Sequence, residues 1–195
     1  MEVTLAELWL PILLGGLAVF FASFVMRMVL KHHWTDFAPV PDEEALRAAF
    51  NSAGVEGGRQ YTIPHCKSAG EMKSPEYQER WAQGPAGFVF LFPKGPNPFG
   101  SALMKSLLFN IFAAFMVAYL ASNFLPAGAS SMDVLQFTGT IAFLTFGGAQ
   151  IWGPIWMAQS WSVCAKELFD SLVYGLAVGG VFVAFWPAAA AAAGA

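Results

Sequence analysis

The sequence predicts an all-α membrane protein, in which a four-helix transmembrane bundle carries a small α+β cytoplasmic insertion between helices 1 and 2. Composition supports this prediction, because 56% of the 195 residues are hydrophobic, 12% are charged and the mean hydropathy is +0.53. A soluble domain carries about twice that share of charge. Four segments are also long and apolar enough to cross a hydrocarbon layer of about 30 Å. Finally, Lys and Arg cluster between the first two of these segments.

The first predicted domain, residues 1–35, is a transmembrane helix over residues 8–30 with the polar stretch that follows it. Glu2 and Glu7 precede the apolar run and no Lys or Arg does, which is the wrong flank for a cleaved signal peptide. We therefore expect the helix to stay in the protein. The run closes with MVLKHHWTDF, residues 28–37, whose Lys, His and Trp are typical of an interfacial collar.

The second predicted domain, residues 36–100, is the cytoplasmic insertion. Asp42 precedes EEALRAAF, and Ser74 with Pro75 opens SPEYQERWAQ, so each stretch begins with residues that favour a helix N-terminus. RQYTIPH and GFVFLF are rich in β-branched and aromatic residues and predict two strands. A unit of this size has little core of its own, so we expect it to lean on the bundle.

The third predicted domain, residues 101–195, holds three transmembrane helices near 103–125, 134–156 and 168–186 and an alanine-rich tail. Small residues spaced by four, such as Gly175 and Gly179, let helices approach closely. We favour packing within one chain over a homodimer as their role. Eight of the ten Lys and Arg residues fall within residues 31–105. Because positively charged loops stay in the cytoplasm, both termini are expected outside.

The histidines are His32, His33 and His65, all on the predicted cytoplasmic side. A haem inside a helical bundle needs ligands that project from the spans, so we expect none here. A zinc site that joins His32 or His33 to His65 and Cys66 is an alternative. Polar residues at a helix C-terminus explain the same histidines more simply. We therefore predict no metal, no cofactor and no catalytic residue.

Ionisable residues within membrane spans are functional candidates. Four of them lie near the cytoplasmic ends of the predicted spans: Arg27, Lys105, Glu167 and Asp170. A layer of structural ion pairs is the simpler interpretation, and the mouth of a transport path is the alternative. Arg27 lies about one turn before the end of the first span and Asp170 just inside the last. We predict that these two residues form a structural ion pair.

Four stretches, HHWTDFAPVPDEEAL, GGRQYTIPH, SPEYQERWAQGPAGFV and FDSLVYGL, follow one another along the chain. In this order of features the sequence resembles a family of uncharacterised bacterial inner-membrane proteins with four transmembrane helices. The resemblance implies a bacterial inner-membrane protein with no assigned reaction, and it transfers no catalytic residues.

The function that we expect is that of a non-enzymatic accessory, assembly or interaction subunit, whose cytoplasmic segment docks a partner. The alternative is a small oligomeric transporter or channel, which needs a polar lumen. An enzyme is not expected, because the sequence shows no nucleophile–base pair and no phosphate-binding loop. The expected partners are the lipid bilayer and a membrane protein or further copies of the chain. A net charge of −3 argues against nucleic acid.

Overall fold

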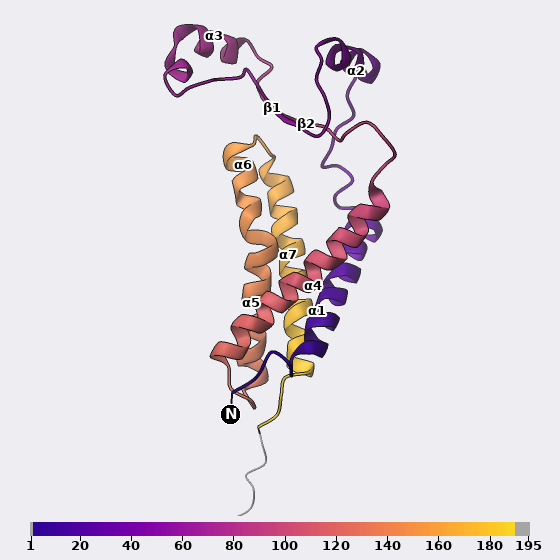
Figure 1. Ribbon diagram of the computed structural model, residues 1–195, viewed down its shortest axis with the longest axis vertical. Helices are drawn as coiled ribbons and strands as arrows, with labels where there is room; N and C mark the ends of the chain where they lie inside the picture. Colours follow the sequence, from indigo (N-terminus) through magenta and orange to yellow (C-terminus); the bar gives the residue numbers. More distant parts are fainter. Residues whose placement is uncertain (1, 190–195) are drawn as a thin grey trace, which may run out of the picture. The chain divides into compact units, whose positions relative to one another are not determined.

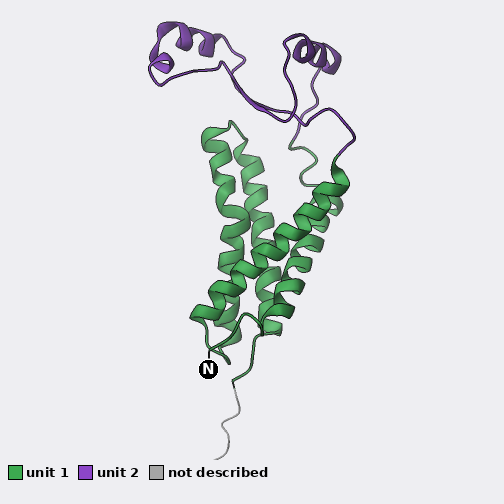
Figure 2. Ribbon diagram, in the orientation of Figure 1, with its two compact units in different colours: residues 1–36, 98–195 green, residues 37–97 purple. Residues whose placement is uncertain are grey.

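The computed structural model describes residues 2–189. The chain divides into two compact units (Figure 2), of which one comprises Met1–Asp36 with Pro98–Ala195 and the other Phe37–Asn97. We call the first unit the bundle and the second the intervening unit. The bundle is helical, and the intervening unit contains short helices and a two-stranded sheet.

Four helical segments of the bundle are long and apolar enough to cross a membrane. They are Trp9–Val29, Phe99–Phe124, Ser131–Trp156 and Trp161–Ala184. The four predicted spans are thereby confirmed as apolar helices of membrane-crossing length. By their length and composition, these helices indicate a membrane protein.

Two of these segments are single helices, α4 (Phe99–Phe124) and α7 (Trp161–Ala184). The first segment is composite, because α1 (Trp9–Phe24) continues into the π-helical turn η1 (Val25–Val29). The third comprises α5 (Ser131–Gly147), the 3₁₀ turn η3 (Gly148–Ile151) and α6 (Trp152–Trp156). An irregular turn therefore ends the first segment, near Arg27, and another interrupts the third segment, near Gln150.

In the bundle, α7 packs against both α1 and α5, and α4 packs mainly against α1 (Figure 1). Glycines permit the closest approaches. A Cβ atom added at Gly175 of α7 would lie 2.7 Å from the backbone oxygen of Gly139 in α5. One added at Gly16 of α1 would lie 2.7 Å from the Cα atom of Ile111 in α4. These approaches lie within one chain, as the packing interpretation of the small residues predicts.

The start of α7 differs from the predicted one. We expected the last span to begin near residue 168, but the helix begins at Trp161, with Ser160 as its N-cap residue. The Ser160 hydroxyl accepts a hydrogen bond from the backbone N–H of Ser162. Glu167 and Asp170 therefore lie in the second and third turns of α7 rather than in its first turn.

The intervening unit contains α2 (Glu43–Ser52), β1 (Gln60–Ile63), the 3₁₀ turn η2 (Glu71–Lys73), α3 (Pro75–Gln83) and β2 (Gly87–Phe90). The strands are antiparallel, with Gln60 opposite Phe90. Asp42 and Ser74 cap the two helices through their side-chain oxygens, as the sequence predicts. Of the residues in this unit, Tyr77 alone is buried.

Candidate functional site

The candidate site lies where α1 ends and α7 begins, which we call the histidine end of the bundle. In η1 the backbone N–H of Leu30 donates to the carbonyl of Val25, five residues earlier, at 3.0 Å. π-Helical turns of this kind are frequent at functional sites. The next residue, Lys31, has a φ of +55°, which costs a residue other than Gly about 1–2 kcal/mol. After this turn, His32, His33 and Asp36 contact side chains of α7.

The two histidines after this turn share one carboxylate. The Nε2 atom of His32 lies 2.8 Å from Oδ1 of Asp170, and that of His33 lies 2.9 Å from Oδ2. The Asp170 side chain is completely buried, and that of His33 is only 8% exposed. Both rings therefore contact a buried acid, a contact that the sequence did not predict.

A second layer of polar groups holds this cluster. Nδ1 of His33 lies 2.5 Å from Oδ2 of Asp36, whose other oxygen accepts a hydrogen bond from Lys166 Nζ at 2.6 Å. The hydroxyl of Tyr174 donates to Oδ2 of Asp170 at 3.4 Å. Each carboxylate thus contacts a histidine and a further donor.

The electrostatics fix the direction of the hydrogen bond between His33 and Asp36. Burial raises the pKa of Asp36, but the hydrogen bonds from Lys166 and His33 outweigh it and hold the pKa below its ordinary value. Burial lowers the pKa of His33, and hydrogen bonds to Asp36 and Asp170 outweigh it, so the pKa lies above its ordinary value. Asp36 is therefore an ionised acceptor, and Nδ1 of His33 donates to it.

Arg27 has a different partner from the one that the sequence predicts. Its guanidinium donates to Oε2 of Glu167 at 2.6 Å, whereas Asp170 faces the histidines. The reason is the early start of α7, which leaves Asp170 deeper in the bundle and Glu167 level with Arg27. The Arg27 side chain is 47% exposed, so this ion pair is partly accessible to solvent.

The other two metal candidates from the sequence belong to the intervening unit. Nδ1 of His65 lies 3.3 Å from the Thr62 hydroxyl, and the Cys66 thiol donates to the carbonyl of Ser68. Within residues 2–189, the group with metal-binding spacing combines His32 and His33 with Asp170 instead. Sequence reasoning missed Asp170 as their partner. The sequence signal that could have indicated this partner is Ser160, because its capping role places the start of α7 at Trp161, earlier than expected.

A cavity of about 500 Å³ adjoins the cluster, between α1, α4, α5 and α7. Its polar lining comes from Arg27 and Tyr174, which also belong to the histidine end, and from Ser23, Ser106 and Asn110. The rest of its lining is apolar: Val19, Phe20, Phe24, Met28, Phe99, Leu103, Phe109 and Phe146. The cavity is therefore mainly hydrophobic, with polar groups at a few positions.

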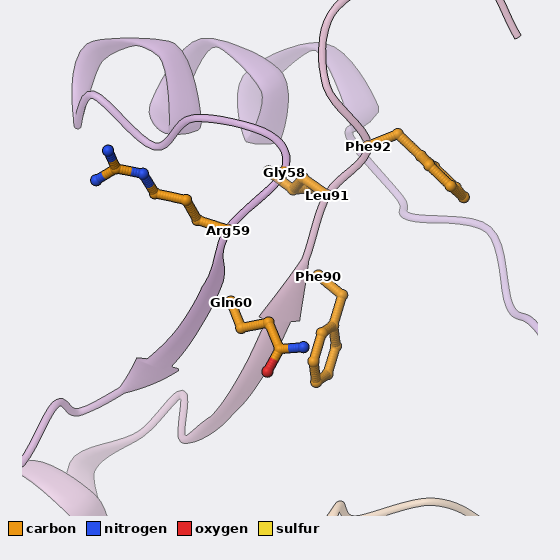
Figure 3. Close-up of a pocket in the computed structure, with 6 residues that line it drawn as sticks. All are labelled: Gly58, Arg59, Gln60, Phe90, Leu91 and Phe92. Carbon is orange, nitrogen blue, oxygen red and sulfur yellow. The ribbon is translucent and has the colours of Figure 1, made fainter. Parts of the chain in front are cut away.

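The intervening unit has an open hollow of about 260 Å³ beside its strands (Figure 3). The register partners Gln60 and Phe90 place their side chains next to each other, while the Phe92 ring points away from the strands. A Cβ atom at Gly57 would come within 1.9 Å of the Phe92 carbonyl oxygen, so only Gly permits this approach. The hollow belongs to the exposed apolar surface of the unit.

Over residues 2–189, the fold and the site define a helical protein with four membrane-length segments and a His–Asp cluster around a buried carboxylate at one end of its bundle. Comparisons of the chain with protein-family models, with curated proteins and with solved structures find no match in any of the three. Function is therefore inferred from the geometry of the chain itself.

Proposed function

We propose that the protein is a multi-pass, non-enzymatic accessory or interaction subunit of the bacterial inner membrane. In this proposal the intervening unit lies in the cytoplasm and docks a second membrane protein, and both termini lie outside. The single observation that carries the proposal is the apolar surface of the intervening unit.

That surface is large for so small a unit. Phe37 is 89% exposed and Phe92 is 80% exposed, although both are large aromatic residues. Other exposed apolar side chains of the unit are Val40, Leu46, Ile63, Met72, Trp81, Phe88 and Phe90. Exposed apolar surface on this scale is typical of interaction sites. A partner that covers it would supply the core that the unit lacks.

Charge favours a protein over the lipid surface as the partner. Residues 37–97 contain six Lys and Arg and seven Asp and Glu, so their net charge is −1. Segments that bind anionic lipids carry clusters of four to eight basic residues without matching acids. The mixed charges of the intervening unit suit the polar rim of a protein interface instead.

The proposed orientation follows from the Lys and Arg distribution. Lys31 and Lys105 flank the intervening unit in the chain, and six further basic residues lie between them. Basic residues within about 15–20 positions of a span end are the ones that keep a loop in the cytoplasm. Lys166, at the start of α7, supports the same orientation.

Site-specific photo-crosslinking in cells tests this function. A photo-reactive phenylalanine analogue at Phe92 should give a discrete protein adduct, and the same analogue at the exposed position Asn51 of α2 serves as the control. Co-expression of two differently tagged copies separates a homo-oligomer from a different partner. If Phe92 yields no protein adduct, or only the adduct that Asn51 also yields, the docking function is wrong.

The alternative function, a small oligomeric transporter or channel, has one observation in its favour. Arg27, Ser106 and Asn110 place polar groups in the cavity of the bundle, and Asn110 is only 7% exposed. A transport path needs a polar lumen, however, and this cavity is lined mainly by aromatic and aliphatic side chains. The interaction function therefore ranks first.

A further inference from the structure

We propose that His32, His33 and Asp170 bind one divalent transition-metal ion at the histidine end of the bundle. The three residues offer two imidazole nitrogens and a carboxylate oxygen. This proposal revises our expectation from the sequence that the histidines bind no metal. It is independent of the docking function, because it rests on different residues in a different unit.

The donor atoms are already close enough for a shared ion. The three ligand atoms all lie within 4.8 Å of one another. Zinc bonds to nitrogen and oxygen measure about 2.0–2.2 Å, so neighbouring ligands of a tetrahedral ion lie about 3.3–3.6 Å apart. The Nε2 atoms lie 2.8 and 2.9 Å from the Asp170 oxygens. The hydrogen-bonded nitrogen and oxygen atoms would therefore separate by less than about 1 Å to admit an ion, and no pair of ligand atoms lies farther apart than 4.8 Å.

The second layer has the arrangement that metal-binding histidines usually show. A histidine that binds a metal through one nitrogen almost always donates its other N–H to a carboxylate, a carbonyl or a water. Nδ1 of His33 makes this contact with Asp36, and Lys166 fixes the other oxygen of that carboxylate. The ring is thus oriented so that Nε2 points at Asp170.

This orientation brings Nε2 of His33 face to face with an oxygen of Asp170, 2.9 Å away. In a neutral ring whose Nδ1 carries the proton, Nε2 presents a lone pair. The facing Asp170 oxygen also presents lone pairs, and the carboxylate is completely buried. A proton or a metal ion must lie between two such acceptors. A metal ion bound here would take the place of that proton between the ring and the carboxylate.

The ligand set selects the class of metal. Imidazole suits zinc, iron, copper and nickel, whereas Mg²⁺ and Ca²⁺ prefer oxygen ligands alone. Two histidines with one carboxylate hold zinc with a further coordination position open, and the same set holds Fe²⁺. We therefore expect Zn²⁺ and Fe²⁺ to bind and Mg²⁺ not to bind. The open position would take a water or a small anionic ligand.

Metal analysis of the full-length protein in mild detergent tests the site. After treatment with a chelator and dialysis against Zn²⁺, we expect about one zinc per chain, and none from an equal concentration of Mg²⁺. His33→Ala and Asp170→Asn should each lose the zinc. His65→Ala is the matched control, because His65 lies in the intervening unit, and it should retain the zinc.

A variant that exchanges one metal ligand for another distinguishes the loss of a ligand from the loss of metal binding through misfolding. His32→Cys replaces an imidazole by a thiolate, which zinc and cobalt both accept. With Co²⁺ as a spectroscopic probe, this variant should gain a sulfur-to-cobalt charge-transfer band in the near ultraviolet that the native protein lacks. The site is wrong if zinc stays unbound in the native protein, if it survives both His33→Ala and Asp170→Asn, or if the cysteine variant shows no new band.

Discussion

Nε2 of His33 and Oδ2 of Asp170 lie 2.9 Å apart, although 137 residues separate them in the chain. The contact ties the segment after α1 to the third turn of α7, deep enough that the carboxylate has no solvent contact. Carboxylates at such depth are rare, because removal from water disfavours their charge. The two histidines are therefore the hydrogen-bond partners of the buried carboxylate, and Asp170 in turn positions both rings.

The first prediction compares the two acids of α7. Asp170→Asn removes the charge that His32 and His33 share, and breaking a buried pair costs up to about 3–5 kcal/mol. Glu167→Gln removes a partner of a half-exposed Arg27, which costs at most about 1 kcal/mol. Asp170→Asn should thus lower the melting temperature in mild detergent much more than Glu167→Gln. Equal losses would mean that Asp170 is not the anchor of the cluster.

The second prediction assigns the partner of Arg27. A double-mutant cycle of Arg27→Gln with Glu167→Gln should give a coupling energy of about 0.2–1 kcal/mol, since the pair lies at a wet rim. The cycle of Arg27→Gln with Asp170→Asn provides the comparison and should give the smaller coupling. Thermal stability in detergent reports both cycles. If the cycle with Asp170→Asn gives the larger coupling energy, Arg27 pairs with Asp170, as the sequence predicted.

The third prediction concerns the contact between α5 and α7. Gly175→Ala places a Cβ atom 2.7 Å from the Gly139 carbonyl oxygen, so the helices must move apart, and overpacking of this kind costs about 1–3 kcal/mol. Gly180→Ala, in the same helix, is the matched control, because nothing lies within 4 Å of the added atom. It should leave the melting temperature unchanged or raise it. A tolerated Gly175→Ala would show that the two helices are not closely packed.

The fourth prediction concerns orientation in the membrane. Ser130 caps α5, at the opposite end of the bundle from the histidines, and is expected outside. With Cys66 and Cys164 replaced, a cysteine at Ser130 should react with a membrane-impermeant thiol reagent in intact cells. A cysteine at Ser160, which caps α7, should react only after the membrane is permeabilised. The reverse pattern would show that the intervening unit lies outside.

The sequence predicted the spans because their signal is strong and local: about 20 successive apolar residues have few alternatives to a membrane helix. The site depended on weaker signals. WSVCAKE, residues 161–167, resembles a polar loop, so the capping role of Ser160 and the depth of Asp170 were missed. No sequence pattern predicts the left-handed backbone conformation at Lys31, because Lys seldom adopts this conformation. The partners of His32 and His33 therefore became evident only from the fold.

The last prediction concerns Lys31, whose positive φ turns the chain so that the histidines reach Asp170. Asn tolerates this backbone region several times better than most residues, whereas a β-branched residue is a genuine outlier there. Lys31→Asn and Lys31→Val both remove the ammonium group, which lies 4.8 Å from the centre of the Trp34 ring. Their difference therefore isolates the backbone effect from the loss of this cation–π contact.

We expect Lys31→Val to be less stable than Lys31→Asn by about 1–2 kcal/mol, measured as thermal stability in detergent. The valine variant should also lose more of its zinc, because the segment that carries both histidines is then displaced from α7. If the two variants melt at the same temperature and bind zinc equally, the turn at Lys31 does not position His32 and His33 against Asp170.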